Sequence, residues 1–393
     1  MLSGLGKSKK KPFQKTKGMI TAPFSIDFVM ESSRGIAALW VFFFHISSMV
    51  QTSWPSGQTL AKYGHYGVSM FFVISGYCIF ASAEKIAQDS SYDYMGFIKR
   101  RLFRILPAFW ISIIVVLILP FFIESLSALK SGNYQQPQPA WIAYSLSDWL
   151  SIISLTKDIF DTGSSIKQGF TLVNSVYWTL AIEIQFYIVI FIALLFKQKW
   201  KIILSFITFA SLFANHIPFQ PNGFFLAFWP IFAIGCGLRI IHTKGFVPSK
   251  IFGTNILSFS FTGIFITLVF GIGILLVQPA VPSVTLALFF SILLWCFGGV
   301  EHFFRTKHQF NSESKKAIFY VFIPFIMLGE CSYSLYLLHG KIYHLPEMFI
   351  RQVLDMSSPL YLISVIFSTS ALCYGYYLLV ERPFQRLQLR RSI

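Results

Sequence analysis

Runs of apolar residues recur along the whole chain, and most are long enough to cross a bilayer as a helix. About 17 to 25 apolar residues cover roughly 30 Å of hydrocarbon, where a helix satisfies its own backbone hydrogen bonds. The pattern predicts an all-α fold, that of a polytopic membrane protein with about ten transmembrane helices. These are expected at residues 34–50, 67–84, 105–124, 172–196, 202–215, 224–241, 252–277, 281–300, 318–339 and 359–380.

One further apolar stretch, residues 141–155, is expected not to span the membrane. It is short, contains Asp148, and carries tryptophans at positions 141 and 149, as segments at a membrane surface do. We expect it on the outer surface, within a loop over about 125–171. Loops of this length often carry function.

Composition supports a membrane protein, because hydrophobic residues make up 55% of the chain, charged residues 12%, and the mean hydropathy is +0.63. With the N-terminus in the cytoplasm, most of the 32 lysines and arginines face the cytoplasm. The outer side receives Lys62, Lys130, Lys157, Lys167, Lys341 and Arg351. Since cytoplasmic loops are enriched in basic residues, both termini are expected there.

Three parts are therefore expected. These are a basic cytoplasmic tail over 1–26, a transmembrane domain over 27–385, and a basic cytoplasmic tail over 386–393. The six N-terminal lysines precede no short apolar core with a cleavage site, so the first span should also direct the chain to the cell (inner) membrane as a multi-pass protein.

The five cysteines lie in apolar segments without metal-type spacing and are interpreted as small core residues. The sequence contains no glycine-rich phosphate loop, nucleophile elbow or zinc-binding helix motif. We therefore expect no bound metal, no permanently bound cofactor and no nucleic-acid partner.

The first predicted helix carries two ionisable side chains, Arg34 and His45, separated by ten residues. Each costs roughly 2.5 to 3.5 kcal/mol at membrane depth, so a helix that keeps both usually uses them. Eleven residues at 1.5 Å each separate them by about 16 Å, so they do not touch. Arg34 is expected near the cytoplasmic mouth and His45 at mid-depth or beyond. Interhelical hydrogen bonding is the alternative role for both.

Residues 30–45 (MESSRGIAALWVFFFH) resemble the first-helix signature of the membrane-bound acyltransferase-3 family, in which ten residues separate an arginine and a histidine. Further blocks follow in the family's order: 67–77 (GVSMFFVISGY), 100–107 (RRLFRILP), 178–187 (WTLAIEIQFY), 332–339 (SYSLYLLH) and 381–383 (ERP). The resemblance covers nearly the whole chain. Ser33 and Glu31 depart from the usual leucine and aspartate, and Ile184 replaces a common second glutamate, which argues against paired carboxylates there.

The resemblance implies transfer of an acyl group, most simply acetyl, from cytoplasmic acyl-CoA to a hydroxyl. The acceptor would be a cell-surface polysaccharide or its lipid-linked precursor in the bilayer, and acyl-CoA a co-substrate. A non-glycan acceptor, such as a lipid or a secondary metabolite, is the alternative. A proton-coupled transporter would also use intramembrane Arg, His and Glu, but the sequence lacks the pseudo-symmetric broken helices typical of such carriers.

Site roles follow from this reading. His45 is the expected general base, since imidazole titrates near neutrality. Glu183 is expected near the outer end of its helix. It would orient a sugar, share a proton with His45 or pair with an arginine. Arg34 and the cluster Arg100, Arg101 and Arg104 are expected to bind acyl-CoA, although cytoplasmic loops are basic in any case. Substrate binding is assigned to Trp178, Tyr333, Tyr336 and His339, for which an aromatic belt is the alternative.

Overall fold

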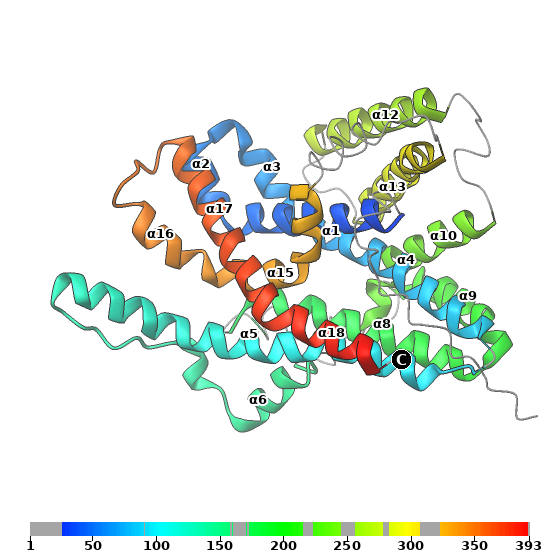
Figure 1. Cartoon of the computed structure of the whole chain (residues 1–393), viewed down its shortest axis with the longest axis horizontal. Helices are drawn as coiled ribbons and strands as arrows, with labels where there is room; N and C mark the ends of the chain where they lie inside the picture. The colour runs from blue at the N-terminus through cyan, green and yellow to red at the C-terminus, as the bar shows by residue number, and fades with distance from the viewer. Residues whose placement is uncertain are drawn as a thin grey trace, which may run out of the picture.

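The computed structural model describes residues 26–89, 91–157, 159, 170, 173–214, 223–244, 256–277, 283–306 and 323–391. Over these residues the regular secondary structure is entirely helical (Figure 1). The predicted N-terminal tail with its six lysines lies almost wholly outside them.

Every predicted span contains a helix, but the helices differ in length. The main ones are α1 (Ile26–His45), α4 (Gly67–Gln88), α5 (Tyr94–Ser131), α8 (Trp178–Leu195), α9 (Trp200–Ser211), α10 (Trp229–Thr243), α12 (Ile256–Val277), α13 (Ser283–Thr306), α15 (Ser332–Ile342) and α17 (Pro359–Tyr376), which a π-turn joins to α18 (Arg382–Arg391). Short helices α2 (Ser47–Ser53), α3 (Gln58–Lys62), α6 (Leu146–Ile153) and α16 (His344–Ile350) lie between them.

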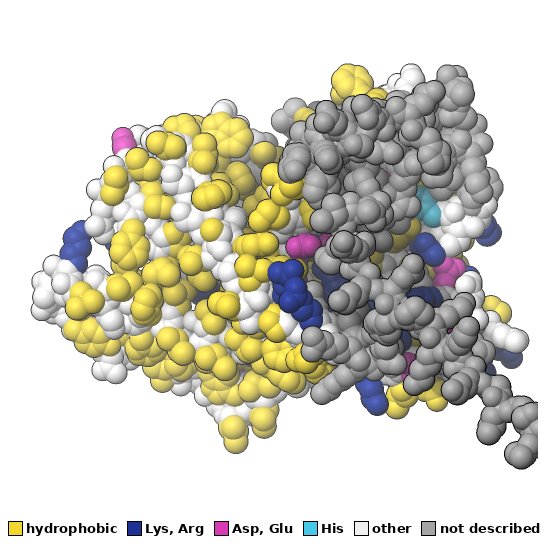
Figure 2. Space-filling view, viewed as in Figure 1, with side chains coloured by type: hydrophobic (Ala, Val, Ile, Leu, Met, Phe, Trp, Pro, Cys, Tyr) yellow, Lys and Arg dark blue, Asp and Glu magenta, His cyan; other side chains and the backbone are white. Residues whose placement is uncertain are grey.

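Five of the described helical segments are long and apolar enough to cross a membrane, or six if α1 and α2 form one broken span. This is fewer than the ten predicted. The 12 residues of α9 and the 15 of α10 reach only about 18 and 22 Å, which is short of the roughly 30 Å of hydrocarbon. Large apolar side chains on α5 and α17, including Ile118 and Phe367, are exposed, and hydrophobic groups cover much of the left half of the face in Figure 2. Such a surface fits contact with lipid.

The first span differs from its prediction at both ends. Helix α1 begins at Ile26, so Arg34 lies eight residues, about 12 Å, inside the helix and not at its edge. The apolar pattern misplaced this boundary because Asp27 and Glu31 occupy the first turns. The chain then bends by 79° between α1 and α2, immediately after His45.

Helix α5 is the longest element, with 38 residues over about 57 Å. The Asp93 side chain caps its start by accepting from the Gly96 N–H at 2.7 Å, and Gly132 ends it in a left-handed conformation with φ 73°. It therefore extends beyond the predicted span 105–124 and takes up the beginning of the predicted outer loop. Its C-terminal end projects at the left of Figure 1, near α16.

The tryptophan-rich stretch 141–155 contains α6, which is only eight residues long and too short to cross a bilayer. Ser145 and Asp148 form a capping box at its start. The Trp110 indole donates to the Ile153 carbonyl oxygen at 3.0 Å, which holds α6 against α5.

Basic residues that the charge pattern assigns to opposite sides lie at opposite ends of the structure. At the end where α5 begins, Lys201 and Arg239 both pair with buried Glu84, at 2.9 and 3.1 Å, and join α9 and α10 to α4. At the other end of α5, Lys130 donates to the Gln352 side chain at 2.6 Å.

Candidate active site

His45 and His339 meet at the bend that ends α1. Their ring centroids are 5.0 Å apart, with the planes inclined by 59°. His339 is fully buried on α15, while His45 is half-buried, and no hydrogen bond joins the His45 ring to another described residue. The two predicted histidines, distant in sequence, therefore form one site.

The partner of His339 defines the role of each ring nitrogen. Its Nδ1 lies 2.9 Å from the Leu335 carbonyl oxygen, which can only accept, so Nδ1 carries the proton. In the neutral ring Nε2 is then an acceptor, and it is buried without a partner among the described residues. An unpaired buried acceptor is costly, and the neighbouring His45 ring is a candidate donor for it.

Arg34 and Glu183 line one small cavity of about 50 Å³. Its other walls come from α4, α8 and α15: Val68, Phe71, Phe72, Ser75, Thr179, Leu180, Tyr333 and Tyr336. No hydrogen bond or ion pair joins the Arg34 guanidinium to another described residue. A guanidinium kept at this depth without a protein partner is available to an anionic ligand group.

This cavity corrects two predicted positions. Arg34 and Glu183 were expected near opposite faces, but the early start of α1 carries Arg34 inward to the level of Glu183 on α8. Glu183 also does not contact His45. Its Oε1 accepts from the Ser75 hydroxyl at 3.0 Å and from the Tyr187 hydroxyl at 2.6 Å.

The predicted substrate-binding aromatic residues separate into two groups. Tyr336 lines the cavity, donates to the Val176 carbonyl oxygen at 3.1 Å, and has its ring 5.8 Å from His339. Tyr333 lines it as well, and donates to the Ile105 carbonyl oxygen at 2.9 Å. Trp178 is not among the lining residues but packs on Phe228, with centroids 5.5 Å apart.

The three arginines of the basic block line a second pocket, of about 620 Å³, at the start of α5. Arg100 pairs with Asp93 at 3.1 Å. The pKa of Asp93 lies below its usual range, mainly because its carboxylate accepts from the Gly96 N–H and also because the Arg100 guanidinium is close. Arg101 donates to the Ser82 hydroxyl, and Arg104 completes the basic wall. This volume and charge suit a phosphorylated ligand.

A series of contacts leads from this inner pocket to the histidines. The Arg101 guanidinium lies over the Tyr187 ring, 5.9 Å from its centroid, and Tyr187 bonds Glu183 at the small cavity. Tyr336, which also lines the cavity, contacts His339. The predicted residues Arg101, Glu183, Tyr336, His339 and His45 therefore lie along one path.

Three further residues, on this path or bonded to the helices that form it, have roles that the sequence analysis did not predict. Tyr187 lies four residues after Glu183 and hence on the same helical face, a spacing that could have identified it. Ser75 gave no signal, since a serine within an apolar helix usually bonds its own backbone. Glu381, 2% exposed at the π-turn, accepts from the Ser334 hydroxyl at 2.5 Å and ties α15 to the final helix.

The chain also matches a known protein family over most of its length. A family model described as an acyltransferase domain matches residues 30–378. A curated relative named "Putative O-acetyltransferase" from Staphylococcus aureus (strain COL) is 33% identical over 208 residues, 50% of this chain and 29% of the relative. The peptidoglycan O-acetyltransferase of Listeria monocytogenes serovar 1/2a is 30% identical over 174 residues, 44% of this chain and 24% of the relative.

The chain thus spans less than a third of the length of these relatives, and no solved structure matches it significantly. The family match includes both histidines, both walls of the small cavity and all three arginines of the inner pocket. The chain belongs to the membrane-bound acyltransferase-3 family.

Proposed function

We propose that this chain is a membrane O-acetyltransferase. It transfers an acetyl group from cytoplasmic acetyl-CoA to a hydroxyl of a cell-surface polysaccharide or of its lipid-linked precursor. The observation that carries this proposal is the meeting of His45 and His339 at one end of a contact path that starts at a basic pocket. The glycan acceptor takes its support from the peptidoglycan-acting relative.

In the proposed reaction, neutral His45 takes the proton of the acceptor hydroxyl as its oxygen attacks the thioester carbonyl carbon. The tetrahedral intermediate collapses, the carbon–sulfur bond breaks, and the departing thiolate receives the proton from the His45 imidazolium. The products are the acetyl ester and coenzyme A. In the reactive arrangement the His45 ring turns to donate an N–H to the unpaired Nε2 of His339, which leaves the other His45 nitrogen for the substrate.

The donor enters at the inner pocket. Coenzyme A carries several phosphate charges, and Arg100, Arg101 and Arg104 present guanidinium groups that bind phosphate through paired hydrogen bonds. Only the uncharged acyl-bearing arm then passes into the bundle, because carrying phosphates through a low-dielectric interior is far costlier. The small cavity must widen for this arm, which passes Arg34 on the cavity wall before the thioester reaches His45.

Mass spectrometry of surface polysaccharide from cells with and without this protein tests the proposal. We expect ester-linked acetyl groups in cells that carry the wild-type chain and their loss in the deletion strain. Restoration by the wild-type gene on a plasmid is the control. An unchanged acetyl content in the deletion strain would contradict the glycan acceptor.

A further inference from the structure

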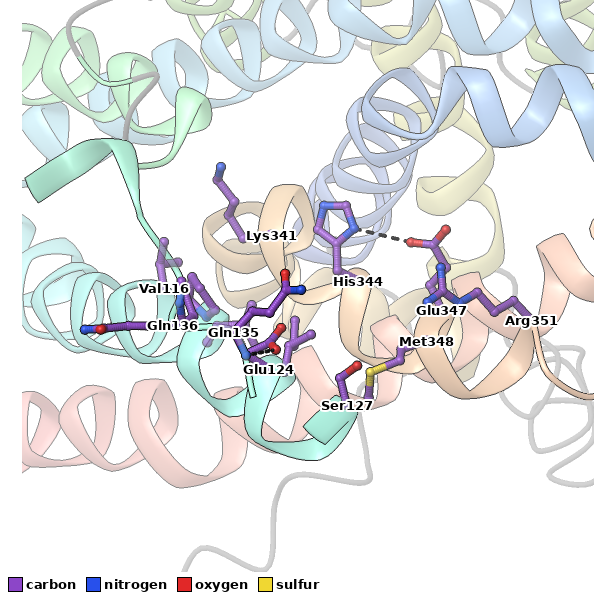
Figure 3. A pocket seen from close by; sticks show the side chains of 14 residues that line it. Val116, Glu124, Ser127, Gln135, Gln136, Lys341, His344, Glu347, Met348 and Arg351 are labelled. Atoms are coloured by element: carbon purple, nitrogen blue, oxygen red, sulfur yellow. Dashed lines mark hydrogen bonds and ion pairs between the residues drawn. The ribbon is translucent and has the colours of Figure 1, made fainter. Parts of the chain in front are cut away.

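A third pocket, of about 640 Å³, lies at the far end of α5 (Figure 3). One wall is the last part of α5, a second is the returning segment 135–137, and the third is α15 with α16. Its lining residues are Val116, Leu119, Pro120, Ile123, Glu124, Ser127, Gln135, Gln136, Pro137, Lys341, His344, Glu347, Met348 and Arg351. This volume falls within the range of about 300 to 1,000 Å³ typical of ligand sites.

Polar contacts hold these walls together. The Gln135 N–H donates to Glu124 Oε1 at 2.8 Å, so the returning segment is fixed against α5. His344 and Glu347 pair at 3.3 Å within α16. The Lys130 bond to Gln352 fastens the end of α5 to the segment after α16. These contacts connect α5, the segment 135–137 and the region of α16, which together form the pocket walls.

The pocket differs in charge from the inner one. Two carboxylates and two cations line it: Glu124, Glu347, Lys341 and Arg351. Two carboxylates also line the inner pocket, but together with four cations, Lys85, Arg100, Arg101 and Arg104. The outer pocket therefore lacks the excess of positive charge that favours a polyanion such as the phosphates of coenzyme A. Carboxylates, amides and cations together offer both hydrogen-bond donors and acceptors, which a polyhydroxylated ligand requires.

Two further features select among polyhydroxylated ligands. The side-chain amides of Gln135 and Gln136 each donate and accept, as an acetamido group also does. Beside Glu124, the α5 wall carries apolar residues, among them Leu119 and Ile123, which suit the carbon–hydrogen faces of sugar rings. The combination fits a chain of N-acetylated sugars.

The outer pocket also adjoins the histidines. Lys341 follows His339 by two residues on α15, and the ring of His339 lies 5.0 Å from that of His45. The Tyr343 ring, one residue before His344, lies 6.3 Å from the ring of Phe42, three residues before His45. A hydroxyl of a ligand in this pocket therefore needs to move only a short distance to reach His45.

We propose that the outer pocket binds the acceptor as an oligosaccharide of N-acetylated sugars and presents one of its hydroxyls, past Lys341, to His45. This inference rests on the proposed acetyltransferase function. Arg101 at the inner pocket and Pro120 at the outer one are 19 residues apart on α5, or about 29 Å, close to the thickness of the hydrocarbon. The donor and the acceptor would thus be bound at opposite faces of the membrane.

The test uses the full chain in detergent and the β-1,4-linked tetramer of N-acetylglucosamine, whose binding is measured by titration calorimetry. We expect the tetramer to bind the wild type and His45→Ala equally. The double variant Gln135→Ala/Gln136→Ala should bind it about tenfold more weakly or worse, because two amide contacts are removed. Gln138→Ala is the matched control, since it changes an exposed glutamine outside the pocket and should not alter binding.

Failure of the wild type to bind the tetramer, or equal binding by the double variant, would overturn the inference. Acetyl-CoA affinity and melting temperature, measured in parallel, should be the same in all variants and exclude misfolding. Coenzyme A release with the tetramer tests the proposed function separately. Binding at the pocket without any release would leave the pocket assignment intact and count against the transferase.

Discussion

At the scale of single residues, the proposed chemistry depends on two histidines that the fold places in contact. His45 is half-buried at the end of α1 and His339 fully buried on α15, so the first can reach a substrate and the second can only hold its neighbour. The two rings should therefore differ in their kinetic effects.

His45→Ala should abolish acetyl transfer while the protein remains in the membrane. A general base typically contributes about a hundred- to ten-thousand-fold in rate, and the neighbouring His339 ring is fully buried, so it does not replace His45 at the substrate. Release of coenzyme A by the purified variant, normalised to protein in the membrane fraction, measures the effect. Wild-type turnover by a well-expressed His45→Ala protein would refute the base assignment.

His339→Ala should lower kcat and leave the KM for acetyl-CoA nearly unchanged, because His339 orients His45 and does not bind the donor. We expect a loss of about ten- to a hundredfold, smaller than that of His45→Ala, together with a shifted pH profile of kcat as the His45 ring loses its neighbour. His339→Asn, which keeps a polar group at the position, should restore part of the rate. A variant with an unaltered pH profile would reduce His339 to a packing role.

At the scale of elements, α5 joins the inner pocket to the outer one, and α4 packs against α10. The start of α5 supplies the arginines of the inner pocket, and its end supplies one wall of the outer pocket. Substitutions at its two ends should therefore affect different substrates.

Arg100→Ala with Arg101→Ala should raise the KM for acetyl-CoA more than that for the acceptor. A phosphate-binding group contributes equally to ground and transition states, so its loss appears mainly in donor KM. Lys99→Ala, a neighbouring basic residue that does not line the pocket, is the control. If donor KM is unchanged and only membrane orientation is impaired, the arginines serve topology instead.

Gly76 and Gly235 let α4 and α10 approach closely, because a Cβ at either position would overlap a backbone carbonyl oxygen of the other helix. Gly76→Ala should therefore lower the melting temperature in detergent by several degrees, through a loss of about 1 to 3 kcal/mol from overpacking. Gly237→Ala, where a Cβ would meet nothing within 4 Å, should not. Equal melting temperatures for both variants would contradict this packing.

The apolar pattern predicted the positions of the helices well, but not their ends or their partners. It started the first span at Arg34 because charged Asp27 and Glu31 look like loop residues, whereas a helix continues through them. The pattern singled out His45, and the family resemblance added Glu183 and His339 as separate candidates. Their contacts, His45 with His339 and Glu183 with Ser75, depend on how helices distant in sequence pack together, which periodicity does not encode.

At the scale of the whole molecule, two pockets of different charge lie about one hydrocarbon thickness apart, and the histidines lie between the small cavity and the outer pocket. Donor and acceptor would then never share a compartment. Acetyl groups would cross the membrane within the protein, while coenzyme A remains on the cytoplasmic side.

Membrane vesicles oriented with the cytoplasmic face outward test this claim most directly. Radiolabelled acetyl-CoA is added outside, and label is measured on glycan enclosed within the vesicles, with His45→Ala vesicles as the control. We predict labelled glycan inside wild-type vesicles and none with the variant. Labelling that requires donor and acceptor on the same side of the membrane would contradict transfer through the protein.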